Sequence, residues 1–137
     1  MLLANLLDTF VSHPRRLFLV DGLGAVVTAA FGVAVAQLEE TFGMPPDAMY
    51  VLSALGCVFA IYSLTCSFSN PRGWQPYLRV IAIANVAFCC ITAGLVVYFH
   101  ERLTALGFAY FAVEWLVIGA VVWVELRTIS ISLSKSR

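Results

Sequence analysis

The sequence predicts an all-α integral membrane protein, a bundle of four transmembrane helices that run up and down with both termini in the cytoplasm. Composition is the first reason: 61% of the residues are hydrophobic and only 12% are charged, whereas a soluble domain has about 25% charged residues. The mean hydropathy of +0.92 agrees. The second reason is four long apolar runs, and the third is the uneven placement of basic residues around them.

Each apolar run is about as long as a membrane-spanning helix. A helix needs roughly 20 apolar residues to cross a hydrocarbon core of about 30 Å. We expect spans at about 17–37, 48–68, 77–99 and 106–124, inside a bundle that covers residues 14–126. At 137 residues the chain holds one such bundle and has no room for a second domain.

Basic residues predict the orientation of the bundle. Seven of the eight flank the odd-numbered side of the spans: Arg15, Arg16, Arg72, Arg79, Arg127, Lys135 and Arg137. The opposite side has Arg102 alone, together with several acidic residues. Because Lys and Arg gather on the cytoplasmic side, we predict cytoplasmic termini in a multi-pass protein of the bacterial inner membrane.

Both ends of the chain fall outside the predicted spans. Residues 1–13 alternate apolar and polar positions with helical spacing, which predicts an amphipathic helix on the membrane surface. The pair Arg15-Arg16 resembles a twin-arginine export signal, but the apolar run that follows is longer than a signal peptide needs. We therefore expect an uncleaved first helix. Residues 127–137 are predicted to be a polar cytoplasmic tail.

Small residues recur along three of the spans. They are Gly24, Thr28, Gly32 and Ala36 in the first, Ser53, Gly56, Ala60, Ser63 and Ser67 in the second, and Ala82, Asn85, Cys89 and Thr92 in the third. Small residues let helix backbones approach closely in lipid. We favour packing within one bundle over a dimer face. The lipid-facing residues are then Val20, Leu23, Val27 and Phe31 in the first span and Leu116, Trp123 and Val124 in the fourth.

Polar side chains inside the apolar runs are the candidate functional residues, since ionisable groups in a membrane are costly. At about 1.5 Å per residue, Asp21 lies roughly 6 Å, Asn85 about 11 Å and Glu114 about 18 Å from the cytoplasmic end of its helix. These groups form a ladder from the cytoplasm to the bilayer centre. This arrangement requires that each helix be rotated so that its polar side chain faces the interior of the bundle.

Two hypotheses compete for this polar interior. In the functional one, Glu114 binds a proton and exchanges it for a cation or a small polar solute, and Asp21, Asn85 and Thr28 line the path. Tyr62 and Tyr110 would hydrogen-bond the carboxyl group. In the structural one, protonated Glu114 donates to a carbonyl or to Asn85. An ion pair would then form between Arg79 and Glu125 or Asp21.

Four spans with an acidic residue, Asp21, in the first resemble the small multidrug resistance exporters. The resemblance covers the helix count and that position. Those proteins have a glutamate near the middle of the helix, whereas Asp21 lies near its inner end, and several assemble in opposed orientations, against which the charge bias argues. The resemblance implies that a chain this short can transport a solute if it forms oligomers.

Other chemistries have less support in the sequence. Cys57, Cys66, Cys89 and Cys90 contain no C-x-x-C pair. His13 and His100 lie at opposite faces of the membrane, so they cannot hold one haem iron. Catalytic motifs, clustered metal ligands, cofactor motifs and a basic nucleic-acid face are also missing from the sequence.

The leading hypothesis is therefore an oligomeric transporter or channel in the lipid bilayer, with a proton-titrating polar site that opens to the cytoplasm. A non-catalytic subunit or scaffold that packs against a larger membrane partner is the alternative. A membrane-embedded enzyme that acts on a lipid or a quinone is third.

Overall fold

The computed structural model describes residues 1–137 and is helical throughout, without strands. The helices are α1 (Leu2–Ser12), α2 (Pro14–Gln37), α3 (Glu39–Phe42), α4 (Pro46–Ser69), α5 (Gln75–Tyr98) and α6 (Ala105–Lys135). Four of them, α2, α4, α5 and α6, are long and apolar enough to cross a membrane. The predicted four-helix bundle is confirmed.

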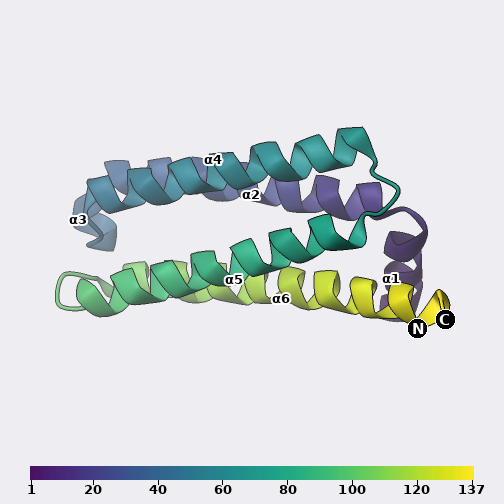
Figure 1. Cartoon of the computed structure of the whole chain (residues 1–137). Helices are drawn as coiled ribbons and strands as arrows, with labels where there is room; N and C mark the ends of the chain where they lie inside the picture. The colour runs from purple at the N-terminus through teal and green to yellow at the C-terminus, as the bar shows by residue number, and fades with distance from the viewer.

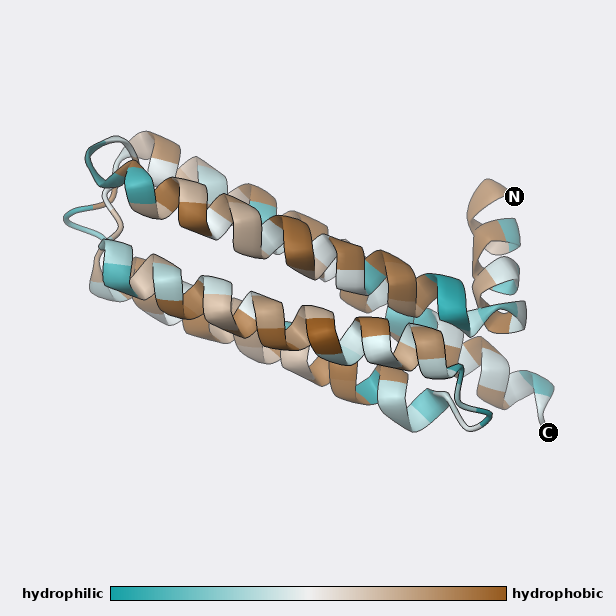
Figure 2. Ribbon diagram, turned by 90° about the horizontal axis from the view of Figure 1, so that it is seen from above, coloured by the Kyte–Doolittle hydropathy of each residue, from teal (hydrophilic) through white to brown (hydrophobic).

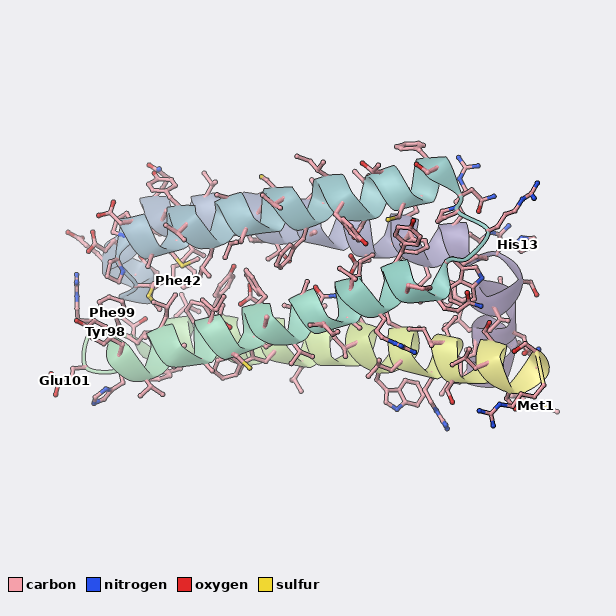
Figure 3. The ribbon with its side chains drawn as sticks, in the orientation of Figure 1. Met1, His13, Phe42, Tyr98, Phe99 and Glu101 are labelled. Carbon is pink, nitrogen blue, oxygen red and sulfur yellow. The ribbon has the colours of Figure 1, made fainter.

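The four long helices are arranged as two hairpins stacked in two layers, α2 with α4 and α5 with α6 (Figure 1). Both termini and the α4–α5 loop lie at one end of the bundle, and α3 lies at the other (Figure 1). Hydrophilic residues gather at these ends, while the shafts are mostly hydrophobic (Figure 2). Figure 3 shows His13 at the first end and Glu101 at the second.

The α2–α4 hairpin is the most closely packed pair because small residues face each other across it. A Cβ on Gly32 would meet the Ser53 side chain, and one on Gly56 would meet Ala29. All five small residues predicted for the second span are buried. In α2 the prediction is wrong for Gly24, where a Cβ would meet nothing within 4 Å. Gly22 is the residue buried against α4.

The lipid-facing surface follows the prediction with one exception. Val20, Leu23, Val27 and Phe31 of α2 are exposed, and so are Leu116 and Trp123 of α6. Val124 is different, since it is partly buried against a cluster of seven buried residues near the N- and C-terminal end of the bundle. The extra length of α6 explains the difference, because the helix continues to pack beyond the predicted span.

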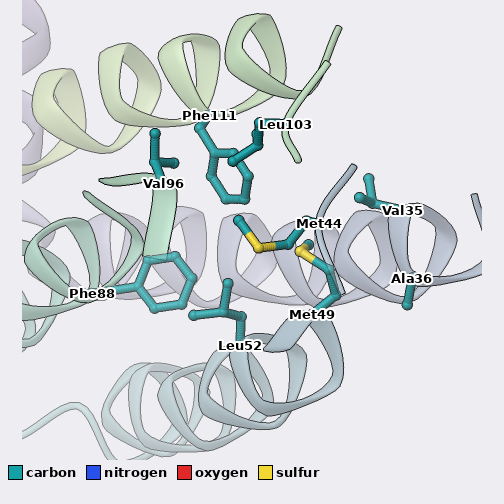
Figure 4. Packing of buried hydrophobic residues seen from close by; sticks show 9 residues of the cluster. All are labelled: Val35, Ala36, Met44, Met49, Leu52, Phe88, Val96, Leu103 and Phe111. Atoms are coloured by element: carbon teal, nitrogen blue, oxygen red, sulfur yellow. The ribbon is translucent and has the colours of Figure 1, made fainter. Parts of the chain in front are cut away.

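A cluster of nine buried residues closes the α3 end of the bundle (Figure 4). Met44 and Met49 lie between Phe111 of α6 and Leu52 of α4 (Figure 4). The chain reaches Met44 through Gly43, whose φ of 82° is the left-handed conformation that ends α3. Methionine is flexible and fills irregular gaps, so this cluster joins the two hairpins.

The junction of α3 and α6 is held by hydrogen bonds around Thr104. Its side chain accepts a bond from the Gly107 N–H, as an N-cap residue does, and donates to the Thr41 carbonyl at 2.6 Å. The Thr104 N–H donates to the Phe42 carbonyl at 3.2 Å. These bonds bring the start of α6 directly against α3.

Residues 127–135 continue α6 as a helix, although a separate polar tail was expected there. Tertiary contacts explain the continuation: Thr128 and Ile129 are buried, and Gln75 of α5 donates to Ser132 at 2.9 Å. Helix α1 crosses the end of the bundle and packs on α6 and α2 (Figure 1). Lys135 forms an exposed ion pair with Asp8 of α1 at 2.8 Å.

One hydrogen bond across the α5–α6 hairpin gives a test of the fold. Trp115 Nε1 donates to Thr92 Oγ1 at 2.8 Å, and Thr92 is fully buried. We expect Trp115→Phe to lower the free energy of unfolding by about 0.6 to 1.7 kcal/mol, the range for hydrogen bonds between membrane helices. Trp123→Phe is the matched control on the exposed face of α6. Equal loss in both variants, measured by unfolding in mixed micelles, would contradict the assigned role of this bond.

Candidate functional site

Four polar side chains, one from each long helix, meet between the two hairpins. They are Asp21 of α2, Ser63 of α4, Asn85 of α5 and Glu125 of α6, and we call them the polar centre. Ser63 Oγ donates to Asp21 Oδ2 at 2.5 Å, and Asn85 Nδ2 donates to Asp21 Oδ1 at 3.0 Å. Glu125 lies beside Asp21 and Asn85. The pairing of Asp21 with Asn85 was not foreseen, although both residues were predicted site residues.

Asp21 is buried, but both of its carboxyl oxygens are hydrogen-bonded. Only 7% of the residue is exposed, and each carboxyl oxygen accepts a hydrogen bond from a different helix. A buried carboxylate is tolerated when its oxygens are hydrogen-bonded. The neighbouring Gly22 has no side chain, which lets α4 come close enough for Ser63 to reach Asp21.

Glu125 is the opposite case. The residue is 0% exposed, and neither of its carboxyl oxygens has a hydrogen-bond partner. The predicted ion pair with Arg79 is not formed, because Arg79 is exposed at the surface of α5, and the only salt bridges are the exposed pairs at the two ends of the bundle. Asp21 does not pair with Arg79 either. The arginine therefore faces outward while both carboxyl groups face inward.

Three cavities with shared walls surround the polar centre and extend from it. Cavity 1, of about 70 Å³, lies between the hairpins and has Asp21, Asn85 and Thr28 in its lining. Cavity 3, of about 200 Å³, shares Asp21 and Asn85 with it and adds Tyr62 and Ser63. Cavity 2, of about 470 Å³, shares Thr28, Val117 and Ile118 with cavity 1 and includes Tyr110 and Glu114.

All six predicted binding residues therefore line this set of cavities: Asp21, Thr28, Tyr62, Asn85, Tyr110 and Glu114. They fall into two groups. Asp21, Asn85 and Tyr62 lie toward the end that carries the termini, and Glu114 and Tyr110 lie toward the α3 end. Thr28 stands between the groups, because it lines both cavity 1 and cavity 2.

Glu114 lies in a mostly apolar environment. Nine of the eleven residues that line cavity 2 are hydrophobic, and the Oε2 atom of Glu114 is buried without a hydrogen-bond partner. The predicted bonds from Tyr62 and Tyr110 are not formed, and neither is a bond to Asn85. Tyr62 and Asn85 lie elsewhere along the bundle, where they line cavity 3, whereas Tyr110 lines cavity 2 together with Glu114 but forms no hydrogen bond to it. Glu114 thus has an unused acceptor in a low-dielectric site.

Ser63 was missed as a site residue, and Glu125 was predicted only as the structural ion-pair partner of Arg79. Ser63 belongs to the small-residue stripe of the second span, where its hydroxyl was read only as a small group. Glu125 lies eleven residues after Glu114, which places both on the same face of one helix. Ser63 could have been found by asking which hydroxyl groups of the small-residue stripe can donate a hydrogen bond to an intramembrane acid of a neighbouring helix.

None of the cysteines lines these three cavities, but Cys66 lies beside Tyr62 and Cys89 lies near Glu114. All four are free, with Cys66 buried and Cys57 and Cys90 exposed. Cys89 is near enough to Glu114 for the two groups to interact electrostatically. Elsewhere the structure gathers no three His, Cys, Asp or Glu side chains that could hold a metal ion together.

Comparison with protein-family models, with curated proteins and with solved structures finds no match to this chain. The four long apolar helices make it compatible with a small multi-pass membrane protein. Any further assignment of function has to come from the chemistry of the polar centre and the cavities.

Proposed function

We propose that this protein is a small membrane transporter in which proton binding at Glu114 is linked to the movement of a solute between the two helical hairpins. One observation carries the proposal: six polar or ionisable residues from four helices line three cavities that share walls. A protein that only packed against lipid or a partner would gain nothing from burying the carboxyl groups of Glu114 and Glu125 without a basic side chain beside them.

The position of the cavities suits movement along the bundle. The polar centre lies toward the end of the bundle that carries both termini, since Asp21 is near the start of α2 and Ser63 is near the end of α4. The distribution of basic residues predicts that this end is cytoplasmic. Glu114 lies farther along α6, beyond Thr28. A proton or a solute that leaves the polar centre would pass Thr28 before it meets Glu114. Asp21 and Glu114 would therefore be successive binding sites along the path.

Cavity 2 supports a proton-titrating role for Glu114 rather than a purely structural one. A carboxyl group in low dielectric tends to be neutral unless a charge partner is present, and Glu114 Oε2 has none. The helices around Glu114 are also loosely packed. Helices α2 and α6 form most of the wall of cavity 2 but make few direct contacts with each other. This looseness gives the bound and unbound states room to differ.

Proton flux in reconstituted vesicles tests the proposal. Purified protein is placed in vesicles that contain a pH-sensitive dye, and a potassium gradient with valinomycin supplies the driving force. We expect wild-type protein to acidify the lumen faster than empty vesicles, and Glu114→Gln to fall to the empty-vesicle rate. Glu101→Gln, which removes the same charge from an exposed residue at the α3 end, should match wild type.

If proton movement is strictly coupled to a solute that the assay does not contain, no proton flux will be seen. Infrared difference spectra between acid and alkaline buffer therefore complement the flux assay, because they detect proton binding directly. The protonated carboxyl band should lose one component in Glu114→Gln and be unchanged in Glu101→Gln. A Glu114→Gln variant that keeps both wild-type flux and the wild-type carboxyl band would show that Glu114 does not exchange protons.

A further inference from the structure

The polar centre contains two buried carboxyl groups and no basic side chain that could balance their charge. Asp21 and Glu125 are both buried, and no Lys or Arg side chain pairs with either, since the salt bridges are confined to the exposed pairs of Arg102 and Lys135. Buried carboxylates in a bilayer are paired, hydrogen-bonded or neutralised. The two hydrogen bonds to Asp21 compensate much of its charge, which leaves Glu125.

A proton shared between the two acids would be one way to neutralise the pair. An acid that donates to a carboxylate has its oxygen about 2.5 to 2.7 Å away. Glu125 is adjacent to Asp21, yet neither Glu125 oxygen forms a hydrogen bond in this structure. Both Glu125 oxygens therefore remain free to accept a positive species beside Asp21.

From this geometry we infer that the polar centre binds a dehydrated monovalent cation, for which the sodium ion is the probe. Carboxylate, amide carbonyl and hydroxyl oxygens are the ligands that hard cations prefer, and the centre supplies all three types through Asp21, Glu125, Asn85 and Ser63. When Glu125 is ionised, its one uncompensated charge matches a monovalent ion. Two carboxylates are fewer than the acidic ligands that calcium sites commonly use.

Two cavities border this site. Asp21 and Asn85 line cavity 1, which lies between the hairpins. They also line cavity 3, whose other lining residues come from α4 and α5. Ser63 opens onto cavity 3. Since each ligand comes from a different long helix, a bound cation would hold the two hairpins together. That is how a coupling ion changes the balance between two arrangements of a bundle.

The use of the cation as a coupling ion for transport rests on the proposed function, but the binding of the cation to the polar centre does not. Binding is therefore measured without flux. Purified protein is unfolded by heat in a mild detergent with sodium chloride, potassium chloride or N-methylglucamine chloride at constant ionic strength. A ligand that binds only the folded state raises the Tm, so we expect a concentration-dependent rise with sodium over N-methylglucamine.

Two variants assign the effect to the site. Glu125→Gln and Asp21→Asn should lose the sodium-dependent rise in Tm, and equilibrium dialysis with radioactive sodium should fall from one bound ion per chain to background. Asp8→Asn removes an exposed carboxylate and should keep both signals. Glu114→Gln should keep them as well, which separates this site from proton exchange at Glu114.

The possible contrary results are distinct. No sodium effect in wild-type protein, or an equal effect in Glu125→Gln, would overturn the cation site and leave proton exchange at Glu114 as a separate question. A rise in Tm with calcium or magnesium but not with sodium or potassium would overturn the monovalent assignment. A fully preserved sodium effect together with absent proton flux and a carboxyl band that is unchanged in Glu114→Gln would support the cation site and count against the proposed function.

Discussion

Replacing Asp21 with alanine should destabilise the protein more than the loss of any other single polar side chain. The substitution leaves two donors, Ser63 Oγ and Asn85 Nδ2, without the acceptors they now have. A buried polar group left unsatisfied costs about 1 to 3 kcal/mol, so the two together lower the free energy of unfolding by several kcal/mol. Relief of the repulsion between Asp21 and Glu125 offsets a part of that loss.

Unfolding in mixed micelles, followed by circular dichroism, measures this effect. Asp8→Ala is the control, because its carboxylate pairs with Lys135 at the surface, and such exposed pairs contribute about 0 to 1 kcal/mol. Asp21→Asn should lie between the two, since the amide keeps one acceptor for the two donors. A loss in Asp21→Ala no larger than that in Asp8→Ala would mean that the polar centre does not join the hairpins.

Replacing Gly107 with alanine should also have a large effect, through packing at the α3 end. A Cβ at this position would collide with the backbone carbonyl of Phe42 and with the side chain of Leu103. The carbonyl belongs to the backbone of α3, which Thr104 holds in place, so the chain must move as a unit. Overpacking of this kind costs about 1 to 3 kcal/mol.

Gly119→Ala is a closely matched control for Gly107→Ala. It lies on the same helix, and a Cβ there would meet nothing within 4 Å. Because alanine has a higher helix propensity than glycine, Gly119→Ala should leave the Tm unchanged or raise it slightly. A similar Tm for the two variants would show that the contact between α3 and the start of α6 does not form in the membrane protein.

Hydropathy and helix periodicity predicted much of this architecture. Four spans follow from run length alone, because lipid demands that every backbone group be bonded within its own helix. The exposed faces of Val20 to Phe31 and of Leu116 follow from the same rule. Asp21, Asn85 and Glu114 were recognisable as candidates, since each is a costly polar group within an apolar run.

The partners of those residues could not be predicted in the same way. Arg79 was assigned to Glu125 on the strength of opposite charge, but the rotation of α5 directs Arg79 to the surface and Asn85 inward. Gly24 was expected in the helix interface, whereas a rotation of about 100° per residue separates its face from that of Gly22. Such rotations depend on all four helices packing together.

The amino-acid sequence by itself determined the helical class, the number and length of the spans, and the presence of carboxyl groups within them, because these are properties of single segments in a hydrocarbon solvent. Only the tertiary structure decided that Ser63, Asn85 and Glu125 meet Asp21, that residues 127–135 extend α6, and that Glu114 belongs to a separate apolar cavity. Pairing of side chains depends on the rotation and depth of each helix relative to the others. Small-residue contacts set both, as where Gly22 and Gly32 admit α4, and no single segment contains that information.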